Sequence, residues 1–183
     1  MQLRDAINLL AGGVDAVGPA IWADLGCGDG TFTLALAELL AAGSTIHAMD
    51  RDGSALRKIP SIHSEVRIVT HRGDFTSHPW PFADLDGILM ANSLHFVKDQ
   101  SAFVRRSIER TTSAGRFLIV EYDTDASSQW VPYPVSKQRL TTLFRETNDV
   151  SITFLAARAS LYRRAPLYAA VIALHREPTV IRP

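Results

Sequence analysis

Short apolar runs alternate with amphipathic segments over the first two thirds of the chain. Between the runs, apolar residues recur at three- and four-residue spacing, as Phe32, Leu36 and Leu39 do, which is typical of a helix face. The pattern predicts five strands, over residues 20–23, 44–49, 66–70, 86–91 and 115–122. Strands that alternate with helices in this way predict an α/β fold with a parallel sheet.

The last third of the chain departs from this alternation. After a helix predicted over residues 99–111, the pattern gives a second helix over 136–147 and strands over 149–156 and 168–175. The connection 157–167 holds no convincing crossover helix, so we expect the last two strands to be antiparallel.

A glycine-rich stretch joins the first predicted strand to the next helix. It reads Asp24-Leu25-Gly26-Cys27-Gly28-Asp29-Gly30, and the helix is predicted over residues 31–42 with Gly43 as the residue that ends it. Glycine lets the backbone approach a ligand closely, and the first N–H groups of a helix favour negative charge. The stretch therefore predicts a site for a carboxylate or a phosphate.

Two acidic residues follow later predicted strands at the same edge of the sheet. Asp50 lies about 20 residues beyond the glycines, where a carboxylate can accept hydrogen bonds from ribose hydroxyls. Alternatively, Asp50 caps a short helix predicted over residues 54–59. Asp74 follows the third strand, and its alternative role is that of an ordinary turn residue.

The stretch from Asp24 to Gly30 resembles the first motif of the class I S-adenosylmethionine-dependent methyltransferases, which is an acidic residue, an apolar residue and then G-C-G-x-G. The dinucleotide fingerprint G-x-G-x-x-G fits less well, because Thr31 stands where its third glycine would be. The resemblance covers residues 20–175. It implies a doubly wound, mostly parallel seven-stranded sheet in the order 3-2-1-4-5-7-6, with the last strand antiparallel and helices on both faces.

We therefore expect a single methyltransferase domain over residues 1–183. It would comprise a short N-terminal helical segment over 1–19, a core over 20–175 and a tail over 176–183. In this family an N-terminal helical segment often covers the active site, and its shortness here suggests a partly open site or a small substrate.

The resemblance also implies the cofactor, S-adenosyl-L-methionine, and the residues that bind it. In the family, an acidic residue at the position of Asp74 binds the adenine amino group, and the next backbone N–H, here that of Phe75, meets a ring nitrogen. The cofactor-binding residues expected on this basis are Asp24, Gly26, Cys27, Gly28, Asp50, Arg51, Asp74, Phe75 and Asn92.

The catalytic half of the site is less defined by the sequence. Methyl transfer is an in-line displacement, so the protein mainly positions the acceptor, and a general base is needed only if the acceptor arrives protonated. Leu94-His95 matches a Leu-His pair that small-molecule members of the family often carry. His95 is the best candidate for the base, because imidazole titrates near neutral pH, although it could instead pack structurally beside the site.

Two segments follow strands at the predicted substrate edge, and each could alternatively be plain surface loop. The first contains Trp130 and Tyr133, which could line an apolar pocket. The second contains Arg158, Arg163 and Arg164, which would favour an anionic acceptor, because the guanidinium fork matches a carboxylate.

Composition narrows the partners. The 19 basic and 19 acidic side chains cancel, which argues against non-specific binding to nucleic acid or membranes. Cys27 is the single cysteine, and we expect a small buried side chain rather than a nucleophile. The histidines show no spacing for zinc, so no metal is expected. Without a signal peptide or a membrane-length apolar run, we expect a cytoplasmic monomer or homodimer with a small-molecule substrate.

Two other functions remain open from the sequence. One is an NAD(P)-dependent oxidoreductase on a related fold, against which Thr31 and the absence of a Tyr-x-x-x-Lys pair count. The other is a catalytically inactive cofactor-binding or scaffold protein that kept the methyltransferase fold.

Overall fold

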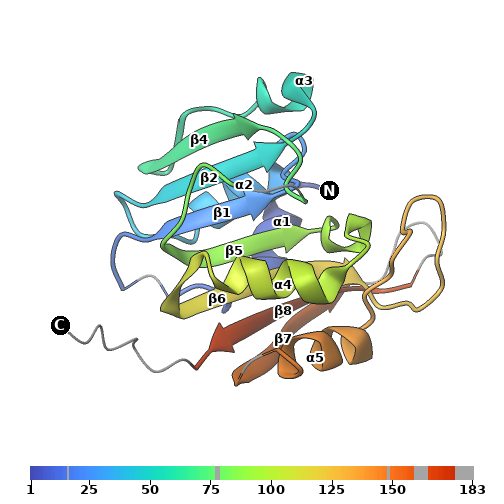
Figure 1. The fold of residues 1–183 in the computed structure, drawn as a ribbon. Helices are drawn as coiled ribbons and strands as arrows, with labels where there is room; N and C mark the ends of the chain where they lie inside the picture. Colours follow the sequence, from blue (N-terminus) through green and yellow to red (C-terminus); the bar gives the residue numbers. More distant parts are fainter. Residues whose placement is uncertain (16, 77–78, 148, 159–164, 176–183) are drawn as a thin grey trace.

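One sheet of eight strands organises the computed structural model, which describes residues 1–15, 17–76, 79–147, 149–158 and 165–175. The strand order is β3-β4-β2-β1-β5-β6-β8-β7 (Figure 1). The strands are β1 (Ile21–Leu25), β2 (Thr45–Asp50), β3 (Ile62–His63), β4 (Val66–Arg72), β5 (Leu85–Ala91), β6 (Thr111–Tyr122), β7 (Val150–Arg158) and β8 (Leu167–Leu174). The helices are α1 (Leu3–Leu10), α2 (Thr31–Ala37), α3 (Gly53–Leu56), the 3₁₀ turn η1 (Leu94–Phe96), α4 (Gln100–Ile108) and α5 (Lys137–Arg145).

The sheet differs from the predicted seven-strand order by an added strand at its edge. β3 has only two residues and pairs antiparallel with β4. Two residues are too few for a hydrophobic period, so the sequence pattern gave no signal for it. The adjacent pairs among β4, β2, β1, β5 and β6 are all parallel, and β8 runs antiparallel to both β6 and β7, as predicted for the last strand.

Helices cover both faces of the sheet, and each face has its own core. α4 and α5 lie on one face in Figure 1, with α1 and α2 behind the other. Phe103 and Phe144 belong to the first core, and Leu10 and Leu36 belong to the second. Neighbouring residues of β5 enter different cores, since Ile88 and Met90 belong to the first and Leu89 to the second. This arrangement confirms that β5 is a central strand buried on both sides.

Three helix ends were predicted too far along the chain. α2 ends at Ala37 and not at residue 42, α3 ends at Leu56 and not at 59, and α4 ends at Ile108, because β6 already begins at Thr111. Gly43 has a φ of +83° but does not terminate α2. The chain leaves the helix earlier because the Ser44 hydroxyl donates to Ala41 O, at 2.6 Å, and accepts from Ala20 N, at 3.0 Å.

The N-terminal helix is part of the second core. Ala6, Leu9 and Leu10 are buried, and α1 contacts α2, β7 and β8. α1 thus packs along one face of the sheet. Among the residues described, no helix combines the length and apolar character needed to cross a membrane.

Candidate functional site

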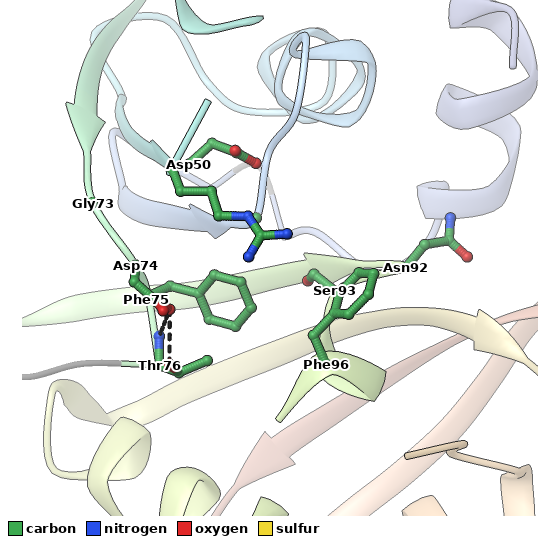
Figure 2. A pocket seen from close by; sticks show the side chains of 10 residues that line it. Asp50, Gly73, Asp74, Phe75, Thr76, Asn92, Ser93 and Phe96 are labelled. Carbon is green, nitrogen blue, oxygen red and sulfur yellow. Dashed lines mark hydrogen bonds between the residues drawn. The ribbon is translucent and has the colours of Figure 1, made fainter. Parts of the chain in front are cut away.

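A cavity of about 350 Å³ lies where β1, β2, β4 and β5 end. Figure 2 shows the rings of Phe75 and Phe96 projecting into it from opposite sides. Of the residues that line it, Gly73, Thr76, Ser93 and Phe96 were not among the predicted site residues. The lining residues are Gly26, Asp50, Arg51, Gly73, Asp74, Phe75, Thr76, Asn92, Ser93 and Phe96. Carboxyl ends of parallel strands are where open α/β sheets bind ligands.

The glycine turn forms one wall of the cavity. A Cβ at Gly26 would lie 2.6 Å from the Cβ of Ser93, and the Gly26 φ of +78° is one that side-chain-bearing residues avoid. At Gly28 the φ is +55°, and an added Cβ would meet no other atom within 4 Å. Gly26 is therefore required for packing against the end of β5, whereas Gly28 leaves open space above the turn.

Asp50 supports the same turn from β2. Its Oδ2 accepts a hydrogen bond from the backbone N–H of Gly28, at 2.9 Å, and its Oδ1 accepts from the N–H of Asp52, at 2.8 Å. Asp52, and not Asp50, is the N-cap of α3, because its carboxylate accepts from the N–H groups of Ser54 and Ala55. The capping role considered for Asp50 is therefore wrong. Each Asp50 oxygen keeps a lone pair that a ligand hydroxyl could use.

Two acceptor oxygens beside the turn are buried without a partner among the described residues. They are Oδ1 of Asp24 and Oδ1 of Asn92. The other Asp24 oxygen accepts from the Thr33 hydroxyl at 2.6 Å. Burial raises the Asp24 pKa to about 7 against the opposing effect of that hydrogen bond, and the charge of Asp50 raises it further. Unpartnered buried acceptors are costly, so they fit a ligand that brings hydrogen-bond donors or positive charge.

Asp74 and Phe75 lie on the opposite wall. Asp74 Oδ1 accepts from the Thr76 N–H at 2.9 Å and from its hydroxyl at 2.7 Å, which are the dashed lines in Figure 2. Asp74 thus does make the turn considered as its alternative role, and its Oδ2 still faces no competing turn bond. The carbonyl of Phe75 accepts from the indole N–H of Trp80, at 2.9 Å, which fixes this wall.

Cys27 lies inside the turn and is buried. Burial raises the pKa of its thiol, and the nearby carboxylates of Asp24 and Asp50 raise it further. The thiolate is the nucleophilic form of cysteine, so these surroundings favour a packing role over a chemical one.

His95 is held by Glu121, a residue that the sequence reasoning missed. The His95 side chain is 3% exposed and Glu121 is 0% exposed. Glu121 Oε2 lies 2.7 Å from His95 Nδ1, and Oε1 accepts from the His95 backbone N–H at 3.2 Å. His95 is not among the residues lining the cavity, but the ring of its neighbour Phe96 is, with its centroid 4.3 Å from that of His95.

The predicted substrate residues are not gathered into one pocket. Trp130 lines a second cavity of about 270 Å³ with Tyr122 and Val131, whereas Tyr133 lines a third with Gln100 and Arg139. The expectation that the two aromatic residues line one pocket is therefore wrong. The turn from Ser128 to Val131 separates them, because these two residues pair through hydrogen bonds of 3.0 and 3.2 Å.

The predicted arginines lie at the limit of the description. Arg158 is the last residue of β7, and nothing is described of its side chain. Arg163 and Arg164 fall in residues 159–164, outside the described residues. In the part of the chain that is described, no three His, Cys, Asp or Glu side chains are grouped so that they could hold a metal ion.

Solved structures share this fold at low sequence identity. An S-adenosylmethionine-dependent methyltransferase from Methanosarcina mazei superposes with a TM-score of 0.68 at 12% identity, covering 90% of this chain and 96% of that one. The 1,6-didemethyltoxoflavin-N1-methyltransferase of Burkholderia thailandensis, solved with its acceptor and S-adenosylhomocysteine, gives 0.64 at 19% identity over 94% of this chain and 77% of that one. The mitomycin 7-O-methyltransferase MmcR gives 0.63 at 15% identity, over 94% of this chain and 53% of that one.

No curated protein matches the sequence. A family model described as a methyltransferase domain matches residues 23–115, which run from β1 through β5 and into β6 and make up just over half of the chain. That stretch contains the glycine turn, Asp50, both walls of the cavity and the turn after β5. The chain accordingly belongs to the methyltransferase-domain family and is a class I S-adenosylmethionine-dependent methyltransferase.

Proposed function

We propose that this enzyme transfers the methyl group of S-adenosylmethionine to a small-molecule acceptor by in-line displacement. The observation that carries the cofactor half is the cavity at the ends of β1, β2, β4 and β5, with two unpartnered buried oxygens beside it. When bound, S-adenosylmethionine supplies an electrophilic methyl group on a sulfonium sulfur. The protein then has to hold the acceptor atom in line with it and exclude water.

The residues around the cavity fit that cofactor chemically. Asp50 retains lone pairs for ribose hydroxyls, while Asp24 and Asn92 offer acceptors suited to an ammonium or amide donor. Phe75 and Phe96 give two ring faces between which a flat heterocycle could stack. We assign cofactor binding to the predicted set: Asp24, Gly26, Cys27, Gly28, Asp50, Arg51, Asp74, Phe75 and Asn92.

The acceptor half rests on the segment after β6. Tyr133 N donates to His95 O at 3.0 Å, so this segment is tied to the turn that carries Phe96. The Trp130 cavity, at about 270 Å³, has room for a small ring system. We assign acceptor binding to Trp130, Tyr133, Arg158 and Arg163, and the general-base role to His95. The Burkholderia and mitomycin enzymes both act on small ring compounds, in keeping with such an acceptor.

Calorimetry tests the cofactor half of this proposal. We expect S-adenosylhomocysteine to bind and NAD to give no heat. Binding of NAD without binding of S-adenosylhomocysteine would overturn it.

A metabolite screen for transfer of a labelled methyl group tests the acceptor half. Small-molecule products support the proposal, and anionic hits would favour the contribution from Arg158 and Arg163. Incorporation of label into protein or nucleic acid alone would contradict a small-molecule acceptor.

A further inference from the structure

Glu121 is a buried carboxylate at the end of an otherwise apolar strand. Leu118, Ile119 and Val120 precede it in β6, and all four residues are essentially inaccessible. A buried carboxylate is tolerated only when its oxygens are satisfied, because it loses its hydration. Both Glu121 oxygens have partners, and both partners belong to His95. Such specific pairing indicates a defined task for Glu121.

The two contacts fix His95 in different ways. Oε1 accepts from the backbone N–H and therefore holds the main chain of the turn after β5, while Oε2 contacts the ring at Nδ1. A carboxylate that has lost its proton can only accept hydrogen bonds, so Nδ1 has to carry the ring proton. In a neutral imidazole this leaves Nε2 with the free lone pair.

The surroundings of His95 connect this arrangement to the active site. Phe96, whose ring packs on His95, lines the cofactor cavity. On its other side, the His95 carbonyl accepts from the N–H of Tyr133, in the segment assigned to the acceptor. His95 therefore lies between the cofactor wall and the acceptor segment, largely shielded from water.

We infer that Glu121 is the positioning residue of this methyltransferase, which holds His95 in the Nδ1–H tautomer so that Nε2 can accept the proton of the acceptor. The inference rests on the general-base role proposed above for His95. Glu121 itself touches neither the cavity nor the acceptor and acts only through His95. Loss of the correct tautomer, rather than loss of the fold, is the defect that its replacement would produce.

Glu121→Gln separates these two effects. The amide has the same shape, and its oxygen has to face the His95 backbone N–H, which can only donate. The NH₂ group is then directed at Nδ1, which becomes an acceptor, so the proton moves to Nε2. Both hydrogen bonds survive and the fold with them, but the base is blocked.

The tautomer can be read directly by long-range ¹⁵N–¹H NMR on protein labelled in histidine, above about pH 7.5, where an ordinary imidazole is neutral. His95→Gln assigns the resonance. We expect Nδ1–H in the wild type and Nε2–H in Glu121→Gln. An Nε2–H tautomer in the wild type would overturn the inference, whether or not an acceptor is known.

Turnover of an acceptor from the labelled-methyl screen gives the second readout. In Glu121→Gln we expect kcat to fall on the order of 100-fold or more, with the dissociation constant of S-adenosylhomocysteine and the unfolding midpoint retained. Glu109→Gln, the same change at an exposed position on the far end of α4, should alter none of these. Unchanged turnover in Glu121→Gln would reduce the pair to a structural contact, whereas failure of the wild type to bind S-adenosylhomocysteine would instead count against the proposed cofactor site.

Discussion

At the scale of single residues, Asp24 combines a structural and a ligand-facing role. It is 1% exposed, and one oxygen is satisfied by Thr33 while the other has no partner among the described residues. The consequence is a raised pKa, from an ordinary value of 3.8 to about 7. An ionised Asp24 is therefore unfavourable in the protein without ligand and becomes favourable when a positively charged group arrives.

This shift makes the stability of the ligand-free protein depend on pH. Between pH 3.8 and about 7 the folded state binds a proton at Asp24 that the unfolded state has lost. The contribution is thus fully present below about pH 4 and disappears as the pH rises through the folded pKa. Asp24→Asn keeps a neutral side chain that can still accept from Thr33, so we expect a flatter curve of unfolding free energy against pH across this range.

Urea denaturation at several pH values measures the effect. At pH 8 the variant should exceed the wild type in stability on the order of a few kcal/mol, because the wild type has to bury a charge. Asp149→Asn, at an exposed position, is the control for removing one carboxylate. Parallel curves for wild type and Asp24→Asn would show that Asp24 does not titrate in this range.

At the scale of elements, periodicity predicted every helix and strand except β3 and the turn η1, and erred mainly at helix ends. The ends depend on bonds such as those of the Ser44 hydroxyl, which join residues far apart in the sequence and leave no periodic signal. The cofactor half of the site was predictable because its residues follow strands in a fixed order. Glu121 was not, because its partner His95 lies on a neighbouring element and only the folded sheet brings them together.

The junction of β2 and α3 shows the same division. Asp50 and Asp52 are two residues apart and both looked like helix caps or ligand residues. In the structure Asp50 holds the glycine turn, and Asp52 caps α3. Asp50→Ala should therefore weaken binding of S-adenosylhomocysteine by about 1–3 kcal/mol, because ribose hydroxyls and the Gly28 N–H lose their acceptor.

Asp52→Ala is the matched variant for this junction. It removes a cap, so we expect a modest loss of stability with cofactor affinity nearly unchanged. Calorimetry together with thermal unfolding distinguishes the two variants. Equal losses of affinity in both would mean that the junction acts only as a structural unit and that Asp50 has no direct part in binding.

At the scale of the whole molecule, the two cores serve different ends of the fold. The first core, under α4 and α5, includes Phe75, which also lines the cofactor cavity. The second core, under α1 and α2, contains none of the cavity's lining residues among its buried members. Stability and cofactor binding should therefore be separable by mutation, depending on which core is altered.

The N-terminal helix allows this separation to be tested. Leu10 is fully buried in α1 and belongs to the second core. Leu10→Ala should lower the unfolding free energy by about 2–5 kcal/mol, since it leaves a cavity between α1 and the sheet. The remaining folded protein should bind S-adenosylhomocysteine with wild-type affinity, because α1 packs on the sheet face and not over the cavity. Val17→Ala, at a position 93% exposed, should change neither property.

Chemical denaturation and calorimetry below the transition provide both quantities for the same samples. Saturating S-adenosylhomocysteine should raise the unfolding free energies of wild type and Leu10→Ala by equal amounts, since the stabilisation depends only on ligand concentration relative to its dissociation constant. A Leu10→Ala protein that is stable but binds the ligand poorly would mean instead that the N-terminal segment reaches the site, as it often does in this family. The location of α1 against α2, β7 and β8 makes the first result the expected one.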